Sequence, residues 1–95
     1  MNKRIQLTHP QGKKLGSIDA GKYALMKTAL LASLKKKGGI THTELLKKVE
    51  QFILDRKKPF SGSLEWYLES VKLDLEASGL ILRIKEGGKL LFMKK

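Results

Sequence analysis

The chain has 95 residues and carries 20 Lys and Arg against 9 Asp and Glu, which gives a formal net charge of +11. A chain of this length folds as one small domain, which excludes multi-domain enzymes and enzymes that enclose a large cofactor. It has no Cys, so disulfides, thiolate metal sites and Cys nucleophiles are excluded and a cytoplasmic protein is expected. No apolar run is long enough for a transmembrane helix or a signal peptide, so no membrane association is expected. The positive charge favours an anionic polymer as the partner.

Residues 1–18 are expected to form an extended arm or a small hairpin in front of the main body, residues 19–95. Two strand-like runs, 4–8 and 13–18, flank His9-Pro10-Gln11-Gly12, whose composition is typical of a turn. The arm and the main body together make a single domain.

The next stretch predicts a helix over about residues 20–37. Asp19 is the expected N-cap, because its carboxylate accepts free backbone amides of the first turn. The pair Gly38-Gly39 stops the helix. Apolar residues recur at steps of three and four and share one face: Tyr23, Met26, Leu30, Leu31 and Leu34.

A second helix is predicted to begin after Thr41 and to end near residue 56 or 57. Thr41 and Glu44 fit a capping box, in which each side chain bonds the backbone amide of the other residue. Pro59 ends the helix, because the residue before a proline disfavours helical backbone. The buried stripe is expected to be Leu45, Leu46, Val49, Phe52 and Ile53.

A third helix is predicted from the Ser63 cap to Gly79. Gly79 takes the left-handed position of a Schellman motif, with Leu80 packed back on Leu75. The expected core face is Leu64, Tyr67, Leu68, Val71, Leu75 and Ser78. The expected outward face holds Glu65, Glu69 and Glu76 in one row and Trp66, Ser70, Leu73 and Ala77 in the next, with Lys72 as its one cation.

The tail predicts a β-hairpin that turns at Gly87-Gly88, since a Gly-Gly pair suits a two-residue loop with positive φ. The expected pairs are Glu86 with Lys89 and Ile84 with Leu91. One face, expected to pack on the core, holds Leu82, Ile84, Leu91 and Met93. Alternation then puts Arg83 and Lys85 on the outer face, where Phe92 opposite Arg83 stacks on its guanidinium.

Three helices followed by a β-hairpin over residues 20–95 resemble the winged helix-turn-helix fold. A closer resemblance covers residues 66–81, with His9-Pro10, residues 19–23 and residues 39–41, and links the chain to a family of small uncharacterised bacterial proteins with a winged-helix-like body. The resemblance implies an α+β fold with a three-helix core, a C-terminal wing and an N-terminal arm. By analogy with DNA-binding winged helices, it also implies a small transcriptional regulator.

The charge distribution changes how such a protein would bind DNA. Residues 59–78, which hold the third helix, carry one Lys against four acidic residues. By contrast, residues 1–18, 19–37, 38–58 and 79–95 each have a net positive charge. Carboxylates facing phosphates repel, so this helix departs from the usual major-groove reader. We expect backbone contacts from the second helix and the hairpin instead. The candidate nucleic-acid-binding residues are Thr41, Thr43, Lys47, Lys48, Arg83, Lys85 and Lys89.

The basic clusters also have a structural interpretation. Residues 35–37 and 56–58 also favour contact with a nucleic acid, but they lie at the C-termini of predicted helices. Cations there complement the dipole whether or not a ligand binds, and this structural interpretation is favoured. The free amides beside Thr41 and Thr43 suit a phosphate, but Glu44 competes for the same donors.

The apolar row of the third helix, formed by Trp66, Leu73 and Ala77, has two interpretations. It packs beneath the N-terminal arm, or it is exposed and forms a homodimer or partner interface rimmed by Glu65 and Glu69. This protein-interaction module is the alternative to DNA binding.

No catalytic set, phosphate-binding loop or metal-ligand spacing is found in the sequence. His9 and His42 are isolated from further metal donors, so each is expected to be packed or hydrogen-bonded. A non-enzymatic protein without a cofactor or a small-molecule substrate is therefore expected.

Overall fold

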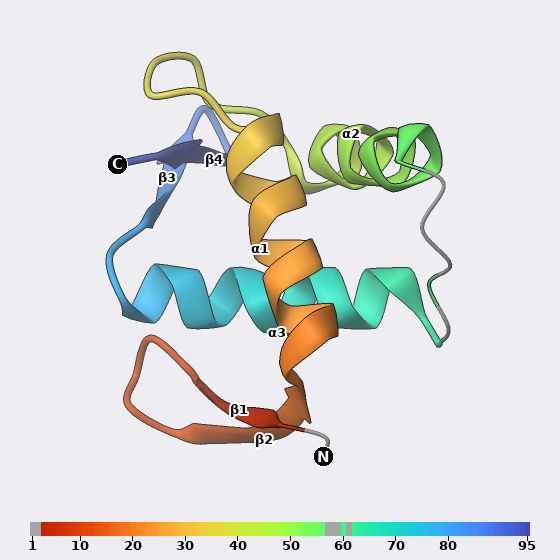
Figure 1. The fold of residues 1–95 in the computed structure, drawn as a ribbon. Coiled ribbons are helices and arrows are strands. Elements are labelled where there is room, and N and C mark those ends of the chain that lie inside the picture. The colour runs from red at the N-terminus through yellow and green to blue at the C-terminus, as the bar shows by residue number, and fades with distance from the viewer. Residues whose placement is uncertain (1–2, 57–59, 61) are drawn as a thin grey trace.

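The computed structural model describes residues 3–56, 60 and 62–95, and over these residues the protein has an α+β fold (Figure 1). A first antiparallel pair consists of β1 (Arg4–Thr8) and β2 (Lys14–Asp19), and a second of β3 (Ile81–Glu86) and β4 (Lys89–Lys94). Between them lie α1 (Ala20–Ser33), α2 (His42–Asp55) and α3 (Leu64–Ala77). Helix α1 crosses α3, with the β1–β2 hairpin near one end of α1 and the β3–β4 hairpin near the other (Figure 1).

The N-terminal arm is a hairpin, as the two strand-like runs predict. Its strands pair from Arg4 opposite Asp19 to Thr8 opposite Lys14, with an irregularity at the turn end. Leu7 and Ile18 are buried in the same core as the helices. The arm is therefore part of the single core and not an appendage.

Asp74 of α3 holds the arm and α1 together. Its carboxylate accepts the hydroxyl hydrogen of Tyr23 at 2.7 Å and the backbone amide of Thr8 at 2.9 Å. Burial and the bond to Asp74 raise the pKa of Tyr23 to about 12. One acidic residue of α3 thus has a structural role that its place in the sequence did not reveal.

Helix α1 is shorter than predicted. Its last residue is Ser33, and Leu34 already has extended backbone and a buried side chain. The following residues run beside β4, where the Lys94 amide donates to the Lys35 carbonyl and Ile40 forms a bridge with Phe92. Gly39 is needed for this approach, because a Cβ there would lie 2.7 Å from the Leu91 Cβ. The prediction of helix to residue 37 is wrong because pairing with β4 replaces the last helical turn.

The ends of α2 and α3 agree with the capping signals. The Thr41 hydroxyl accepts a hydrogen bond from the Glu44 amide at 3.2 Å, and the Glu44 carboxylate accepts one from the Thr41 amide at 3.4 Å. These two bonds confirm the capping box. Ser63 caps α3 at the Trp66 amide. The Schellman bonds after α3 are also present, since Gly79 has positive φ and the Leu80 amide donates to the Leu75 carbonyl at 2.9 Å. Pro59, the predicted stop for α2, lies outside the described residues.

Two parts of the predicted face of α3 are wrong. Ser78 is exposed and donates its hydroxyl to the Leu75 carbonyl, so it is not part of the core. Lys72, expected on the outward face, is only 2% exposed. It lies in register with Leu68 and Leu75, four residues before and three after, on the face that packs inward.

The β3–β4 hairpin has the predicted register but the opposite face inward. Glu86 pairs with Lys89, Ile84 with Leu91 and Arg83 with Phe92. The buried residues are Ile81 and Phe92, whereas the face predicted to be buried is partly or largely exposed: Leu82, Ile84, Leu91 and Met93. Both faces carry apolar residues, so alternation alone does not choose between them. The turn at Gly79 and the bridge from Ile40 to Phe92 hold the hairpin so that the Phe92 ring faces the helices.

The core extends through every helix and both hairpins. All three helices contribute apolar side chains with less than a tenth of their surface exposed, as do both hairpins. These side chains are Leu7, Ile18, Met26, Ala29, Leu30, Leu34, Leu45, Val49, Ile53, Leu68, Val71, Leu75, Ile81 and Phe92.

Candidate nucleic-acid interface

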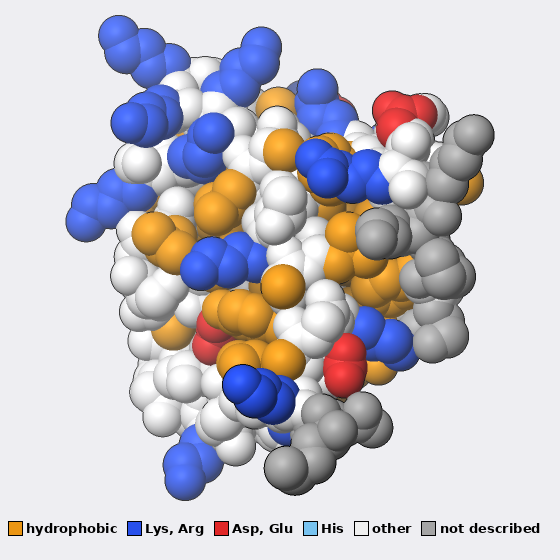
Figure 2. Space-filling view, in the orientation of Figure 1, with side chains coloured by type: hydrophobic (Ala, Val, Ile, Leu, Met, Phe, Trp, Pro, Cys, Tyr) orange, Lys and Arg blue, Asp and Glu red, His pale blue; other side chains and the backbone are white. Residues whose placement is uncertain are grey.

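Lysines from three segments gather at one corner of the molecule. The loop after α1 carries Lys35, Lys36 and Lys37, α2 carries Lys48, and the end of the chain carries Lys94 and Lys95. We call these six residues the basic patch. The bond between the Lys94 amide and the Lys35 carbonyl, 2.8 Å long, places the end of β4 beside the loop. Figure 2 shows Lys and Arg side chains gathered at the upper left, the corner that holds this loop and the C-terminal end in Figure 1.

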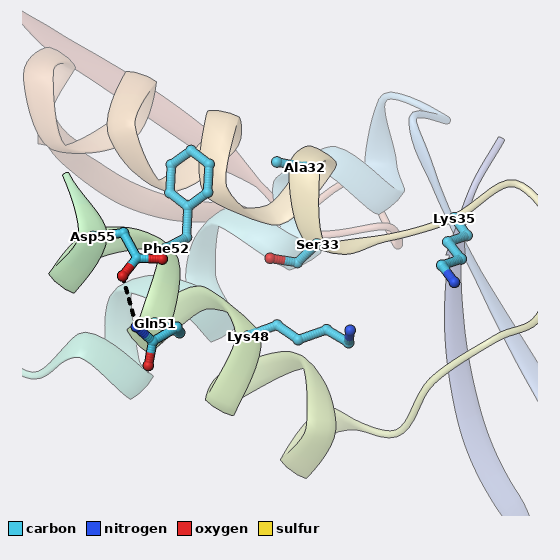
Figure 3. A pocket seen from close by; sticks show the side chains of 7 residues that line it. All are labelled: Ala32, Ser33, Lys35, Lys48, Gln51, Phe52 and Asp55. Carbon is cyan, nitrogen blue, oxygen red and sulfur yellow. Dashed lines mark hydrogen bonds between the residues drawn. The ribbon is translucent and has the colours of Figure 1, made fainter.

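A shallow cavity of about 320 Å³ extends the basic patch toward α2. Lys35 and Lys48 line its charged side, and the ammonium of Lys48 extends toward Lys35 (Figure 3). Phe52 and Ala32 form an apolar wall, and Asp55 lies on the side away from the lysines. The cavity therefore combines two cations, an aromatic ring and one carboxylate.

The lysines of the basic patch are not neutralised by neighbours. In the described part of the chain, Lys72 pairs with Glu69 and Arg83 with Glu76, and the His42 ring contacts Glu65 and Glu69. No carboxylate among these residues lies within ion-pair distance of a lysine of the basic patch. Five of these lysines are exposed and Lys94 is half-buried, and without a carboxylate partner among the described residues they create a positive potential at this corner.

The structure separates the predicted nucleic-acid-binding residues into different surroundings. Lys48 lies in the basic patch, and Lys47, next to it on α2, is exposed. Lys85 and Lys89 are exposed near the tip of the β3–β4 hairpin. Residues 35–37 and the end of β4, which the candidate set omitted, join Lys48 because the loop pairs with β4.

Arg83 was predicted to lie on the outer face of the hairpin. In the structure it lies beside α3. Its guanidinium donates to Glu76 at 2.7 and 3.2 Å and lies 5.3 Å from the centre of the Phe92 ring. The predicted stacking on Phe92 is therefore confirmed, but Phe92 is buried and faces the helices. Arg83 is engaged within the protein and is a weaker candidate for phosphate contact than the lysines of the basic patch.

Thr41 and Thr43 lie at the start of α2, where the capping box already occupies two polar groups. The Thr41 hydroxyl contacts both the amide and the carboxylate of Glu44. The carboxylate at the helix N-terminus opposes an incoming phosphate. A phosphate at this end of α2 would have to displace Glu44.

Sequence reasoning missed a cluster of polar groups around the buried Lys72. The Lys72 ammonium lies 3.2 Å from Nδ1 of His42, 3.3 Å from Glu69 and 3.9 Å from the centre of the Phe92 ring. Burial lowers the pKa of Lys72, and the charge of Glu69 opposes this shift. The Nε2 atom of His42 lies 3.3 Å from Glu65. The signal in the sequence was the helical register of Lys72 with Leu68 and Leu75.

The row formed by Trp66, Leu73 and Ala77 is only partly covered. Trp66 is 52% exposed and packs edge-on against Tyr67, with the ring centres 5.0 Å apart. Ala77 is exposed and Leu73 is half-buried. The arm reaches α3 at Asp74 through the Thr8 amide, so it lies beside the row without burying Trp66. The interpretation that the arm covers the whole row is wrong.

The comparison with known families adds one relationship. A family of unknown function (DUF6958) matches residues 4–91, which is nearly the whole chain. The chain belongs to this family. No curated protein matches the chain, and no solved structure does.

The DUF6958 match covers the arm, the helices and most of the β3–β4 hairpin. Within residues 3–56, 60 and 62–95, no group of three or more His, Cys, Asp or Glu side chains is arranged to hold a metal ion. None of the helices described for this family member is long and apolar enough to cross a membrane.

Proposed function

We propose that this protein is a non-enzymatic, winged-helix-like DNA-binding protein, with a role in transcriptional regulation, that holds the duplex by its phosphate backbone through the basic patch. The observation that carries the proposal is the convergence of lysines from three chain segments on one surface without a carboxylate partner. Phosphate contacts by lysine supply most of the affinity of non-specific DNA binding.

The arrangement of the C-terminal half supports the winged-helix part of the proposal. Helices α2 and α3 precede the β3–β4 hairpin, and the bridge between Ile40 and Phe92 adds a short third strand segment beside β4. A helix pair followed by a hairpin is the order of elements in winged helix-turn-helix proteins that bind DNA.

The charges on α3 favour the basic patch over the usual recognition helix. Glu69 and Glu76 pair with Lys72 and Arg83, and Glu65 lies 3.3 Å from the His42 ring. These pairs hold the start of α2 and strand β3 against α3, so the acidic residues of this helix serve the fold. Binding through the basic patch avoids placing α3 against phosphates, and it predicts weak sequence selectivity.

The test is binding of a fluorescent DNA duplex by anisotropy at about 50 and about 200 mM salt. We expect micromolar binding at the lower salt and a loss on the order of 100-fold at the higher salt, as expected for about four phosphate contacts. The double variant Lys36→Glu/Lys37→Glu should weaken binding at least tenfold and flatten the salt dependence.

The matched control is Lys13→Glu/Lys14→Glu, which makes the same change in net charge at the turn of the arm. This control should change the affinity less than threefold. Equal losses in the two double variants would show that only net charge matters. Absence of binding by the unmodified protein at the lower salt would refute the proposed function.

A second candidate function is a homodimer interface at Trp66, favoured by the half-exposed indole ring on α3. Trp is a frequent anchor of protein interfaces. If this surface pairs two copies, light scattering should give a dimer mass that Trp66→Ala lowers to the monomer mass with unchanged circular dichroism. A monomer mass for the unmodified protein up to millimolar concentration would exclude this interface.

A further inference from the structure

The cavity beside the basic patch has charged and apolar groups on different sides, unlike a surface that carries only cations. Its charged side is formed by Lys35 and Lys48, which come from different segments, and its apolar wall by Phe52 and Ala32 (Figure 3). The guanidinium of Arg56 lies 4.3 Å from the centre of the Phe52 ring and supports it. The volume of about 320 Å³ lies at the lower end of the range for small-ligand sites.

The third side of the cavity is rich in hydrogen-bond acceptors. The Gln51 amide nitrogen donates to one carboxylate oxygen of Asp55 at 2.7 Å, which orients both side chains. The other Asp55 oxygen points toward Phe52 (Figure 3). The Ser33 hydroxyl donates to the Ala29 carbonyl at 2.7 Å, so its oxygen is left to accept. A ligand that fits this side presents hydrogen-bond donors, such as N–H groups.

An anion, a flat ring and a pair of N–H donors occur together in a guanine nucleotide. Its Watson–Crick edge carries a ring N–H and an exocyclic amino group side by side, which match a carboxylate. Adenine presents one amino group beside an acceptor nitrogen. This nitrogen and the carboxylate are both acceptors, so they repel each other. Unpaired bases are commonly bound in this way, by stacking on an aromatic ring and hydrogen bonds to the Watson–Crick edge.

We propose that this cavity is a guanine-nucleotide subsite that holds the phosphate between Lys35 and Lys48, rests the base against Phe52 and binds its N–H donors at Asp55. As part of DNA binding, this inference rests on the proposed function: the subsite takes an unpaired guanine next to a duplex that the basic patch holds. The same chemistry suits a free guanine nucleotide, and the experiment separates the two sources.

The experiment uses two kinds of probe. In the first, guanosine monophosphate and adenosine monophosphate are titrated into isotope-labelled protein, and the Gln51 side-chain amide signal is followed. In the second, anisotropy compares a blunt duplex with duplexes that carry a short overhang of guanines or of adenines. We expect about tenfold tighter binding of the guanine form of each probe, the contribution of a charged hydrogen bond.

Asp55→Asn separates the subsite from simple electrostatics. The variant removes one negative charge, so a purely electrostatic surface predicts tighter binding of every anionic probe. The proposed subsite predicts that the guanine preference falls below twofold. Glu50→Gln makes the same charge change on α2 outside this cavity and should keep the preference.

Each outcome has a defined meaning. A blunt duplex that binds without any guanine preference in either probe overturns the subsite and leaves the proposed function standing. A guanine preference for the monophosphate but not for the overhang supports the subsite with a free nucleotide as its ligand. Failure of the blunt duplex to bind refutes the proposed function, and the monophosphate titration then decides the subsite alone.

Discussion

Replacing Lys72 by Ala is expected to lower the free energy of unfolding by about 3 kcal/mol. The side chain is 2% exposed, and its ammonium lies over the Phe92 ring at 3.9 Å. Truncation leaves a cavity between α3 and β4 and removes the contacts of the ammonium with His42 and Glu69. Urea denaturation followed by circular dichroism measures the loss.

Lys72→Met is the informative companion, because it keeps the length of the side chain and removes the buried amine. The carboxylate that loses its partner, Glu69, is 45% exposed and therefore remains accessible to water. We therefore expect Lys72→Met to stay within about 1 kcal/mol of the unmodified protein. A loss as large as that of Lys72→Ala would show that the amine itself, and not its stem, holds α2 and β4 on α3.

The same pair of proteins tests the titration of Lys72. Burial lowers the pKa of Lys72 in the folded protein below its usual 10.5, so the unfolded chain holds this proton at pH values where the folded protein has released it. The stability of the unmodified protein relative to Lys72→Met should rise as the pH increases toward 10.5. A difference that is independent of pH in this range would contradict the lowered pKa.

Replacing Asp74 by Ala is expected to cost about 3 kcal/mol, because it removes two hydrogen bonds to a charged group at once. The Tyr23 hydroxyl and the Thr8 amide both lose their acceptor, and both are partly buried. The loss should be accompanied by faster amide hydrogen exchange in β1. Asp74→Asn keeps one acceptor oxygen and should cost about half as much, whereas equal costs would show that the charge dominates.

The raised pKa of Tyr23 adds a pH dependence to this interaction. The folded protein keeps the phenol proton up to about pH 12, whereas the unfolded chain loses it near 10.0. Stability from this group is therefore complete below pH 10 and is lost as the pH rises toward 12. Tyr23→Phe should remove this part of the alkaline destabilisation, and its absorbance titration should lack the step near pH 12.

The local signals in the sequence predicted the elements well where a cap or a turn marks an end. The capping box of Thr41 and Glu44, the Ser63 cap and the Schellman turn at Gly79 all appear in the structure. The register of the last hairpin follows from Gly87-Gly88 in the same way. These features depend on residues close together in the chain, and the backbone chemistry of those residues is sufficient to specify them.

The errors occur where a contact between distant segments outweighs a local preference. Helix α1 ends early because residues 35 and 40 pair with β4, and the hairpin turns Phe92 inward because the turn at Gly79 and the Ile40 bridge set its orientation. Lys72 is buried because Glu69, His42 and Phe92 compensate its desolvation. Glu69 is three residues before Lys72 on the same helix, but His42 and Phe92 lie far from it in the chain and reach it only through the fold.

The candidate site shows the same division. Lys48 was a predicted site residue, whereas Lys35 was interpreted mainly as a cation at a helix end and Lys94 was not a candidate. Only the fold brings the segments that carry them together. Asp55 and Gln51 were not among the predicted site residues, and they become one side of a cavity when α1 packs on α2.

The amino-acid sequence alone sets the net charge of +11, the three helices with their caps and the two hairpin turns, since charge is additive and these local structures depend on short-range backbone chemistry. The fold sets which charges remain available. Packing pairs Glu65, Glu69 and Glu76 with His42, Lys72 and Arg83, and leaves the lysines of the basic patch without a carboxylate partner in the described part of the chain. A desolvated charge needs a partner nearby, and which partner is near depends on tertiary packing.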